Sequence, residues 1–183
     1  RWLIEQGWHV TLSEPSAEML AQAQASLSTH PLVTQLEFLP HSIQTLPHRQ
    51  DGFDLIVCHA VLEWLANPKT TLQQLVTHLK PDGYLSLMFF NRLSKEFRHL
   101  IGGDLKAVLN NQIASDGQQG LAPISPLLPT EVLSWLPELQ LELISWSGVR
   151  CFYDYAHHGI RSKMPLDEVL LLERHYSQQE PLR

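Results

Sequence analysis

Residues 53–58 form an apolar run that is typical of a buried β-strand, and the pattern that follows this run constrains the fold most. A polar and aromatic stretch, residues 58–68, comes next and leads into a helical pattern over roughly 69–79. A Pro81-Asp82-Gly83 turn is predicted to end this helix, and the apolar run from Tyr84 to Phe90 predicts a second strand. A strand, a crossover helix and a strand in this order are typical of a parallel sheet covered by helices.

The same alternation is present upstream. Residues 9–13 and 36–39 predict two more strands, and a helix is expected between them from Ser16, its N-cap, to about Leu27. Met19 and Leu20 are predicted to face inward from this helix. We therefore predict an α/β fold with a mainly parallel sheet, in which ligands bind at the carboxyl ends of the strands.

The length of 183 residues and the hydrophobic content of 44% suit one core, so we predict a single domain over residues 1–183. The regular alternation of strands and helices is interrupted twice. We expect insertions on the substrate side at 91–129 and 150–183. Around these insertions the sequence predicts further elements. They are a helix capped by Thr130 and running to Leu136, a strand over 139–147 and a helix over 165–176.

Composition excludes several classes of protein. Two cysteines are too few for a disulfide framework, and they form no cluster with metal-ligand spacing, so we expect no metal site. No apolar run approaches the roughly 20 residues that span a bilayer, and the sequence does not begin with an export signal. We therefore expect a cytoplasmic protein with no membrane partner.

Charge is distributed unevenly along the chain. The net charge of −6 argues against general binding of nucleic acids, because phosphate affinity comes mostly from Lys and Arg. Residues 91–106 nevertheless carry a net charge of +2, and residues 150–163, which include Arg150, Arg161 and Lys163, also carry +2. These segments are either ordinary solvated faces or surfaces for an anionic partner.

Three predicted strands are followed by residues that can contact a nucleotide. Glu14 follows the first strand, where α/β folds place the carboxylate that accepts the ribose hydroxyls of an adenosine. Ile43 and Gln44 follow the next strand, where an apolar side chain and an amide can hold an adenine ring. His59 directly follows the third strand. Read separately, Glu14 could be a surface glutamate and His59 a histidine paired within the fold.

Two residues of the loop after His59 are expected to have structural roles. Trp64 is predicted to pack, and Glu63 to cap a helix or face solvent.

The order of elements, with Leu79-Lys80-Pro81-Asp82-Gly83-Tyr84-Leu85 at its centre, resembles the second half of a Rossmann-like class I methyltransferase that uses S-adenosylmethionine. Four stretches narrow the resemblance to the bacterial tRNA 5-carboxymethoxyuridine methyltransferase family, and it then covers essentially the whole chain. They are 59–64, 85–91, 147–155 and 172–181.

This resemblance implies methylation of the carboxylate of 5-carboxymethoxyuridine at the wobble position of tRNA, which gives a methyl ester. The cofactor contacts of the family that come after its glycine loop fall on Glu14, Ile43, Gln44 and His59. A carboxylate is ionised at neutral pH, so the reaction needs no general acid or base.

Under the same resemblance, a second set of residues is expected to contact the anticodon arm of tRNA. Arg150 is the first candidate for the substrate carboxylate, and Arg92 and Arg98 lie in the basic stretch that would meet phosphates. The full set is Arg150, Tyr153, Tyr155, Asn91, Arg92 and Arg98.

The printed sequence lacks the first strand of the methyltransferase fold, with its glycine-rich turn, and we expect the last strand to be absent as well. In that fold the first strand lies between the second and the fourth. Either the sequence is part of a longer polypeptide, which we expect, or a second chain completes the sheet, so its activity in isolation is an open question.

Two other functions remain compatible with the residues. One is a methyltransferase of the same fold that acts on a small carboxylic acid or a lipid precursor. The other is a non-catalytic module that binds RNA or a partner. The sequence does not specify an oligomeric state.

Overall fold

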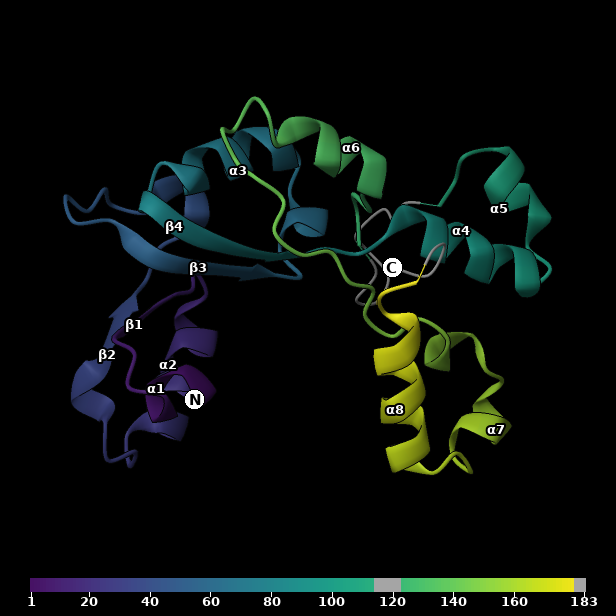
Figure 1. Ribbon diagram of the computed structural model, residues 1–183, viewed down its shortest axis with the longest axis horizontal. Coiled ribbons are helices and arrows are strands. Elements are labelled where there is room, and N and C mark those ends of the chain that lie inside the picture. Colours follow the sequence, from purple (N-terminus) through teal and green to yellow (C-terminus); the bar gives the residue numbers. More distant parts are fainter. Residues whose placement is uncertain (114–122, 180–183) are drawn as a thin grey trace. The chain divides into compact units, whose positions relative to one another are not determined.

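The computed structural model describes residues 1–113 and 123–179, and these fall into two compact units (Figure 1). Of the described residues, unit 1 contains 1–90 and 123–126, and unit 2 contains 91–113 and 127–179. Unit 2 begins at the residue where the first insertion is predicted to begin. The assignment of the whole chain to one domain stays a prediction.

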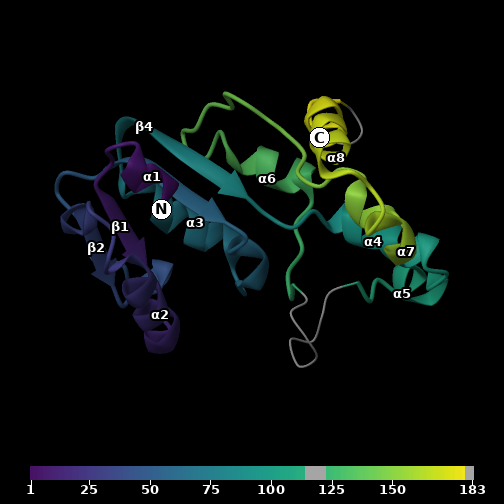
Figure 2. The same ribbon diagram turned by 90° about the horizontal axis from the view of Figure 1, so that it is seen from below.

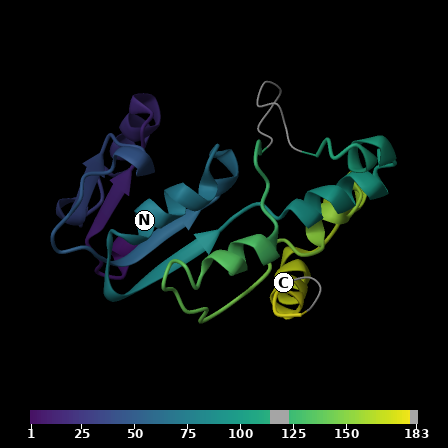
Figure 3. The same ribbon diagram turned by 90° about the horizontal axis from the view of Figure 1, so that it is seen from above.

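Unit 1 contains four strands that form two parallel pairs, as Figure 3 shows from above. The strands are β1 (Val10–Ser13), β2 (Leu36–Leu39), β3 (Phe53–His59) and β4 (Leu79–Met88). β1 pairs with β2, and β3 pairs with β4. The four predicted strands and the parallel α/β architecture are therefore confirmed, although β4 begins at Leu79, before the predicted start at Tyr84.

Short helices precede and connect these strands. They are α1 (Trp2–Glu5), α2 (Ala17–Leu27) and α3 (Pro68–Val76), with the 3-10 turns η1 (Val33–Gln35), η2 (Ile43–Thr45) and η3 (Leu62–Trp64). The Ser16 hydroxyl caps α2 by accepting the N–H of Met19 at 3.3 Å, as predicted. Leu20 is buried, but the prediction for Met19 is wrong, because its side chain lies on the outer side of the helix and is 55% exposed.

Helix α3 lies along the β3–β4 pair (Figure 2). Its inner face consists of Thr71, Leu72 and Leu75, all of which are buried. Pro68 occupies the first turn, where a missing backbone N–H costs nothing. The helix ends at Val76, three residues before the predicted end, because β4 already begins at Leu79.

The Pro81-Asp82-Gly83 stretch lies inside β4 and does not end the helix, which corrects the prediction. Phe53 is opposite Leu79, but Leu55 is opposite Tyr84, so the extra residues of β4 form a bulge. Asp82 adopts a left-handed φ of 62°. At Gly83 a Cβ would lie 3.0 Å from the carbonyl oxygen of Phe53, so the close approach of the two strands requires glycine.

Unit 2 is helical. Its elements are α4 (Arg92–Ile101), α5 (Leu105–Leu109), α6 (Pro129–Trp135), η4 (Tyr153–Tyr155), α7 (His158–Arg161) and α8 (Leu166–Tyr176). The helices predicted before 136 and after 165 are confirmed, although Leu128 takes the cap position predicted for Thr130. No helix in residues 1–113 or 123–179 is long and apolar enough to cross a membrane.

The two separate stretches of unit 2 meet at its start. The Arg92 N–H donates to the carbonyl of Leu127 at 2.9 Å, beside an isolated parallel bridge between Asn91 and Leu127.

The strand predicted over 139–147 is wrong. Residues 141–148 have no regular secondary structure, and Leu143 and Ile144 are 50% and 75% exposed. An alternating pattern yields a strand only where another strand offers its backbone, and none of the four strands described pairs with this segment.

Candidate functional site

Glu14 follows β1 directly and is fixed at both its backbone and its side chain. Its N–H donates to the carbonyl of Leu39 at 3.1 Å, which continues the β1–β2 ladder by one residue. Its Oε1 accepts the N–H of Ser16 at 2.8 Å. Within the described residues Oε2 accepts no hydrogen bond, so this oxygen is available to a ligand at the end of the strand.

Ile43 and Gln44 lie in η2, after β2. A reciprocal capping box between Ser42 and Thr45 holds this turn. The Gln44 amide donates to the hydroxyl of Thr71 in α3 at 3.4 Å, and Ile43 is half-buried. The structure therefore places these two residues beside the helix that follows β3.

His59 is the last residue of β3 and is exposed. Its Nε2 lies 2.8 Å from the hydroxyl of Ser86 in β4, so the ring is oriented across the two strands. Ala60 follows with a φ of 55°, an uncommon conformation for a residue with a side chain. The chain changes direction sharply here, and β3 ends at His59.

Glu63 is buried at 2% exposure, which corrects the prediction that it caps a helix or faces solvent. Burial raises the pKa of its carboxyl, although the backbone N–H groups of Glu63 and Phe90 favour the charged form. Its Oε2 is buried and has no partner among the described residues. Its carbonyl accepts the N–H of Ser125 at 2.8 Å, so Glu63 also connects to residues distant in sequence.

Cys58 and Trp64 flank the same turn. Burial, with a further contribution from the charge of Glu63, raises the pKa of the Cys58 thiol to about 11, so the thiol is protonated and unreactive at neutral pH. Trp64 was predicted to pack, but 39% of its surface is exposed.

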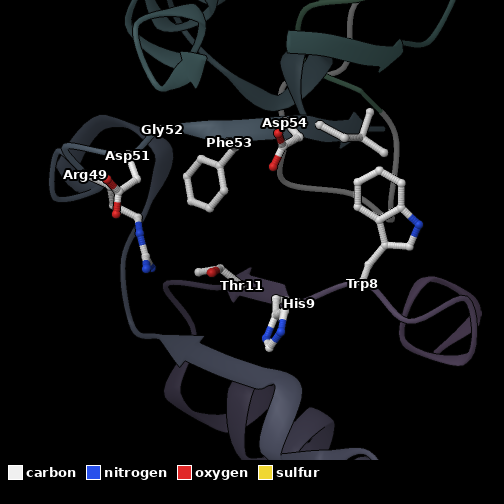
Figure 4. Close-up of a pocket in the computed structure, with 9 residues that line it drawn as sticks. Trp8, His9, Thr11, Arg49, Asp51, Gly52, Phe53 and Asp54 are labelled. Carbon is white, nitrogen blue, oxygen red and sulfur yellow. The ribbon is translucent and has the colours of Figure 1, made fainter.

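A pocket of unit 1 lies between β1 and β3 (Figure 4). Figure 4 shows His9 and Thr11 on the β1 side and Phe53 and Asp54 on the β3 side. Trp8 also lines it. None of the predicted cofactor residues lines this pocket.

Unit 2 contains the residues predicted to bind the substrate. Arg150 has a φ of 60°, its side chain is 65% exposed, and its Nη2 donates to Oδ1 of Asp154 at 2.5 Å. The Tyr155 hydroxyl donates to that of Ser94 in α4 at 2.6 Å. The structure thus brings the 150–155 segment against α4, the helix that contains Arg92 and Arg98.

Two of the residues predicted to bind the substrate stabilise helix α4 or its surroundings. Asn91 caps it, because its Oδ1 accepts the N–H of Leu93 at 2.9 Å. Arg92 donates to Glu96 at 3.0 Å and also bonds Asn111. Arg98 is exposed on this helix.

Glu173, in α8, holds the 150–155 segment in place and was missed by sequence reasoning. Its carboxylate accepts three successive backbone N–H groups, from Cys151 at 2.5 Å, Phe152 at 3.2 Å and Tyr153 at 3.0 Å. Burial and the Glu173 charge raise the pKa of the Cys151 thiol. The pairs are more than 19 residues apart in sequence, so no local pattern reveals them.

The predicted site residues divide between the units. Glu14, Ile43, Gln44 and His59 all belong to unit 1. The six residues expected to contact tRNA all belong to unit 2. In the described part of the chain, no group of three His, Cys, Asp or Glu side chains could hold a metal ion.

Comparison with known proteins first concerns unit 1. A family model described as a methyltransferase domain matches residues 1–87, which is nearly the whole first stretch of unit 1. Among solved structures, a SAM-dependent methyltransferase from Methanosarcina mazei has a TM-score of 0.62 at 19% identity, covering 83% of this chain and 77% of that one. The YcgJ protein of Bacillus subtilis has a TM-score of 0.54 at 16% identity, covering 93% and 68%.

Curated relatives extend the similarity through unit 2. The malonyl-[acyl-carrier protein] O-methyltransferase of Erwinia billingiae is 29% identical over 93% of this chain and 66% of its own length. The tRNA 5-carboxymethoxyuridine methyltransferase of Escherichia coli K12 is 32% identical over 98% of this chain and 69% of its own length. The protein is therefore a class I methyltransferase that depends on S-adenosylmethionine, and it belongs to the family of the tRNA 5-carboxymethoxyuridine methyltransferases.

Proposed function

We propose that this protein transfers a methyl group from S-adenosylmethionine to the carboxylate of 5-carboxymethoxyuridine at the wobble position of tRNA, in the cytoplasm. The observation that carries the proposal is the 32% identity over 98% of the chain to a tRNA 5-carboxymethoxyuridine methyltransferase. The similarity includes unit 2, where basic side chains on α4 and near Arg150 suit an RNA partner.

The residues at the strand ends of unit 1 fit the cofactor. The unbonded Oε2 of Glu14 can accept a ribose hydroxyl, while Ile43 and Gln44 offer an apolar surface and an amide to an adenine. His59 is held by Ser86 through Nε2, so its Nδ1 would meet the methionine part. When bound, S-adenosylmethionine supplies an electrophilic methyl group on a sulfonium.

The contribution of the protein is to bind and orient the reactants. The substrate carboxylate, with an ordinary pKa near 4, is ionised at neutral pH, so no side chain has to remove a proton. Holding the two reactants in line supplies most of the acceleration, and a site that excludes water leaves the carboxylate oxygen more reactive. We assign no residue as a general acid or base.

The acceptor would be held by unit 2. Tyr153 and Tyr155 offer aromatic faces to an unstacked base, and the guanidinium groups beside Asp154 can hold its carboxylate. Arg92 and Arg98 would contact phosphates of the anticodon arm, with Asn91 fixing the start of their helix.

The test is transfer of radioactive methyl from S-adenosylmethionine to tRNA that contains 5-carboxymethoxyuridine. We expect labelled tRNA whose label is released by mild alkali, because an ester is hydrolysed and a methylated base or ribose is not. The control is tRNA with 5-methoxyuridine, which lacks the carboxylate and should remain unlabelled. Label that resists alkali, or equal labelling of the control, would contradict the proposal.

A second candidate is methylation of a small carboxylic acid or acyl-carrier substrate. The similarity to a malonyl-[acyl-carrier protein] O-methyltransferase favours it. Label transfer to malonyl-[acyl-carrier protein] without tRNA would support this alternative. A folded protein that shows no binding of S-adenosylmethionine in calorimetry would instead support a non-catalytic module.

A further inference from the structure

Arg161, at the end of α7, lies beside the 150–155 segment and has unused capacity to bind an anion. Its Cζ is 5.9 Å from the centre of the Tyr153 ring, and its Nη1 is 3.9 Å from Oδ1 of Asp154. Its Nε is buried and has no hydrogen-bond partner among the described residues. A guanidinium has five N–H donors, so this group has several that Asp154 does not use.

Arg150 differs from Arg161 in both exposure and pairing. Its side chain is 65% exposed, against 27% for Arg161, and it donates to Asp154 at 2.5 Å. The carboxylate of Asp154 thus faces two guanidinium groups, and its closer contact is with Arg150. The positive charge that remains is concentrated on Arg161, which is also the better shielded of the two from water.

The surroundings of Arg161 are held in place by α8. Glu173 accepts the N–H of Tyr153, so the ring that packs under the guanidinium has a fixed backbone. Asp154 follows directly and shares this support. A cation that is oriented in advance by an aromatic face and a carboxylate binds an incoming anion with little loss of conformational entropy.

We propose that Arg161, and not Arg150, binds the substrate carboxylate, with Tyr153 and Asp154 orienting its guanidinium. The inference rests on the proposed function. A single N–H contact from the guanidinium holds one oxygen of the carboxylate and leaves the other free to attack the methyl group. Asp154 lowers the net positive charge at the site. The bound carboxylate is therefore less strongly stabilised and stays more nucleophilic.

The test compares binding of two tRNAs in the presence of S-adenosylhomocysteine, one with 5-carboxymethoxyuridine and one with 5-methoxyuridine. We expect the wild-type protein to prefer the carboxylated tRNA by about tenfold, since hydrogen bonds to charged groups are strong. Arg161→Ala should reduce this preference to within about twofold, and Arg161→Lys, which keeps the positive charge on a side chain of different shape, should retain part of it.

Two variants serve as controls. Arg174→Ala removes an equal charge from the exposed side of α8 and should keep the preference, as should Arg150→Ala. Unchanged thermal unfolding and unchanged affinity for S-adenosylmethionine establish that the variants are folded. If Arg161→Ala is not folded, Arg161→Lys tests whether Arg161 binds the carboxylate.

Two different results separate an error in the role of Arg161 from an error in the proposed function. If Arg150→Ala abolishes the preference and Arg161→Ala keeps it, the inference is wrong while the enzyme still methylates the carboxylated tRNA. If the wild-type protein shows no preference and no alkali-labile methylation, the proposed function is wrong and the inference falls with it.

Discussion

The side chain of Glu63 lies in an unusual environment for a carboxyl group, because it is buried and one of its oxygens has no partner among the described residues. Burial raises its pKa above the ordinary value of 4.5, so the folded protein binds this proton more tightly than the unfolded chain does. Stability from this group is therefore complete below pH 4.5 and is lost as the pH rises through the raised pKa.

Glu63→Gln should remove this loss, because glutamine has the same shape and does not ionise. We expect the free energy of unfolding of the variant, relative to wild type, to increase from pH 4.5 towards pH 7, as measured by urea denaturation at a series of pH values. Glu131→Gln, at an exposed position in α6, should follow the wild-type profile. Parallel profiles for wild type and Glu63→Gln would refute the assignment.

Glu14 leads to a prediction about the cofactor. Glu14→Gln removes the charge of the oxygen that we assign to the ribose, and a charge-assisted hydrogen bond contributes about 1.5 to 3 kcal/mol. The affinity for S-adenosylmethionine in calorimetry should fall roughly tenfold or more. Glu18→Gln changes an exposed carboxylate of α2 and should bind the cofactor normally. Equal affinities for the two variants would remove Glu14 from the site.

Among the elements of unit 2, α8 fixes the 150–155 segment through the carboxylate of Glu173, and its Tyr176 adds an edge-on ring contact to Phe152. Glu173→Ala leaves three backbone N–H groups without their acceptor and should lower the free energy of unfolding by about 2 kcal/mol. Glu173→Gln should lose less, because its amide oxygen still accepts. Glu168→Ala, on the exposed side of α8, should have an effect below about 0.5 kcal/mol. A loss of similar size at both positions would mean that α8 does not anchor the segment in this way.

The elements of unit 1 could be predicted because their signals are local. Apolar runs bounded by turn residues mark all four strands, and Ser16 marks the start of α2. The failures concern partners that are distant in sequence. Residues 139–147 alternate like a strand but find none to pair with, and the positions of Glu63 and Glu173 depend on Ser125 and on residues 151–153. The strand-end residues of the candidate site could be selected, but the partners of Arg161 could not.

Across the chain, the two proposed sets of binding residues lie in different units. The residues that we propose for the cofactor lie in unit 1, and the basic residues that we expect to contact tRNA lie in unit 2. A change confined to one unit should therefore affect one ligand only, which the relevant binding constants can test separately.

Arg98→Ala is the corresponding variant in unit 2. Loss of one phosphate contact should weaken tRNA binding and reduce the slope of its salt dependence by about 1, with the affinity for S-adenosylmethionine unchanged. The measurement is the dissociation constant for tRNA at several salt concentrations. An unaltered slope would place this part of α4 outside the RNA surface.

The side of β1 that faces the pocket of Figure 4 should have a distinct signature in amide hydrogen exchange. Backbone groups alternate along a strand, and the N–H of Glu14 points to β2, so that of Leu12 does as well. The N–H groups of Thr11 and Ser13 then point to the opposite edge. These two amides lie at the edge of β1 with which none of the other described strands pairs, so they should exchange faster than those of Leu12 and Glu14. Equal exchange at all four positions would contradict this.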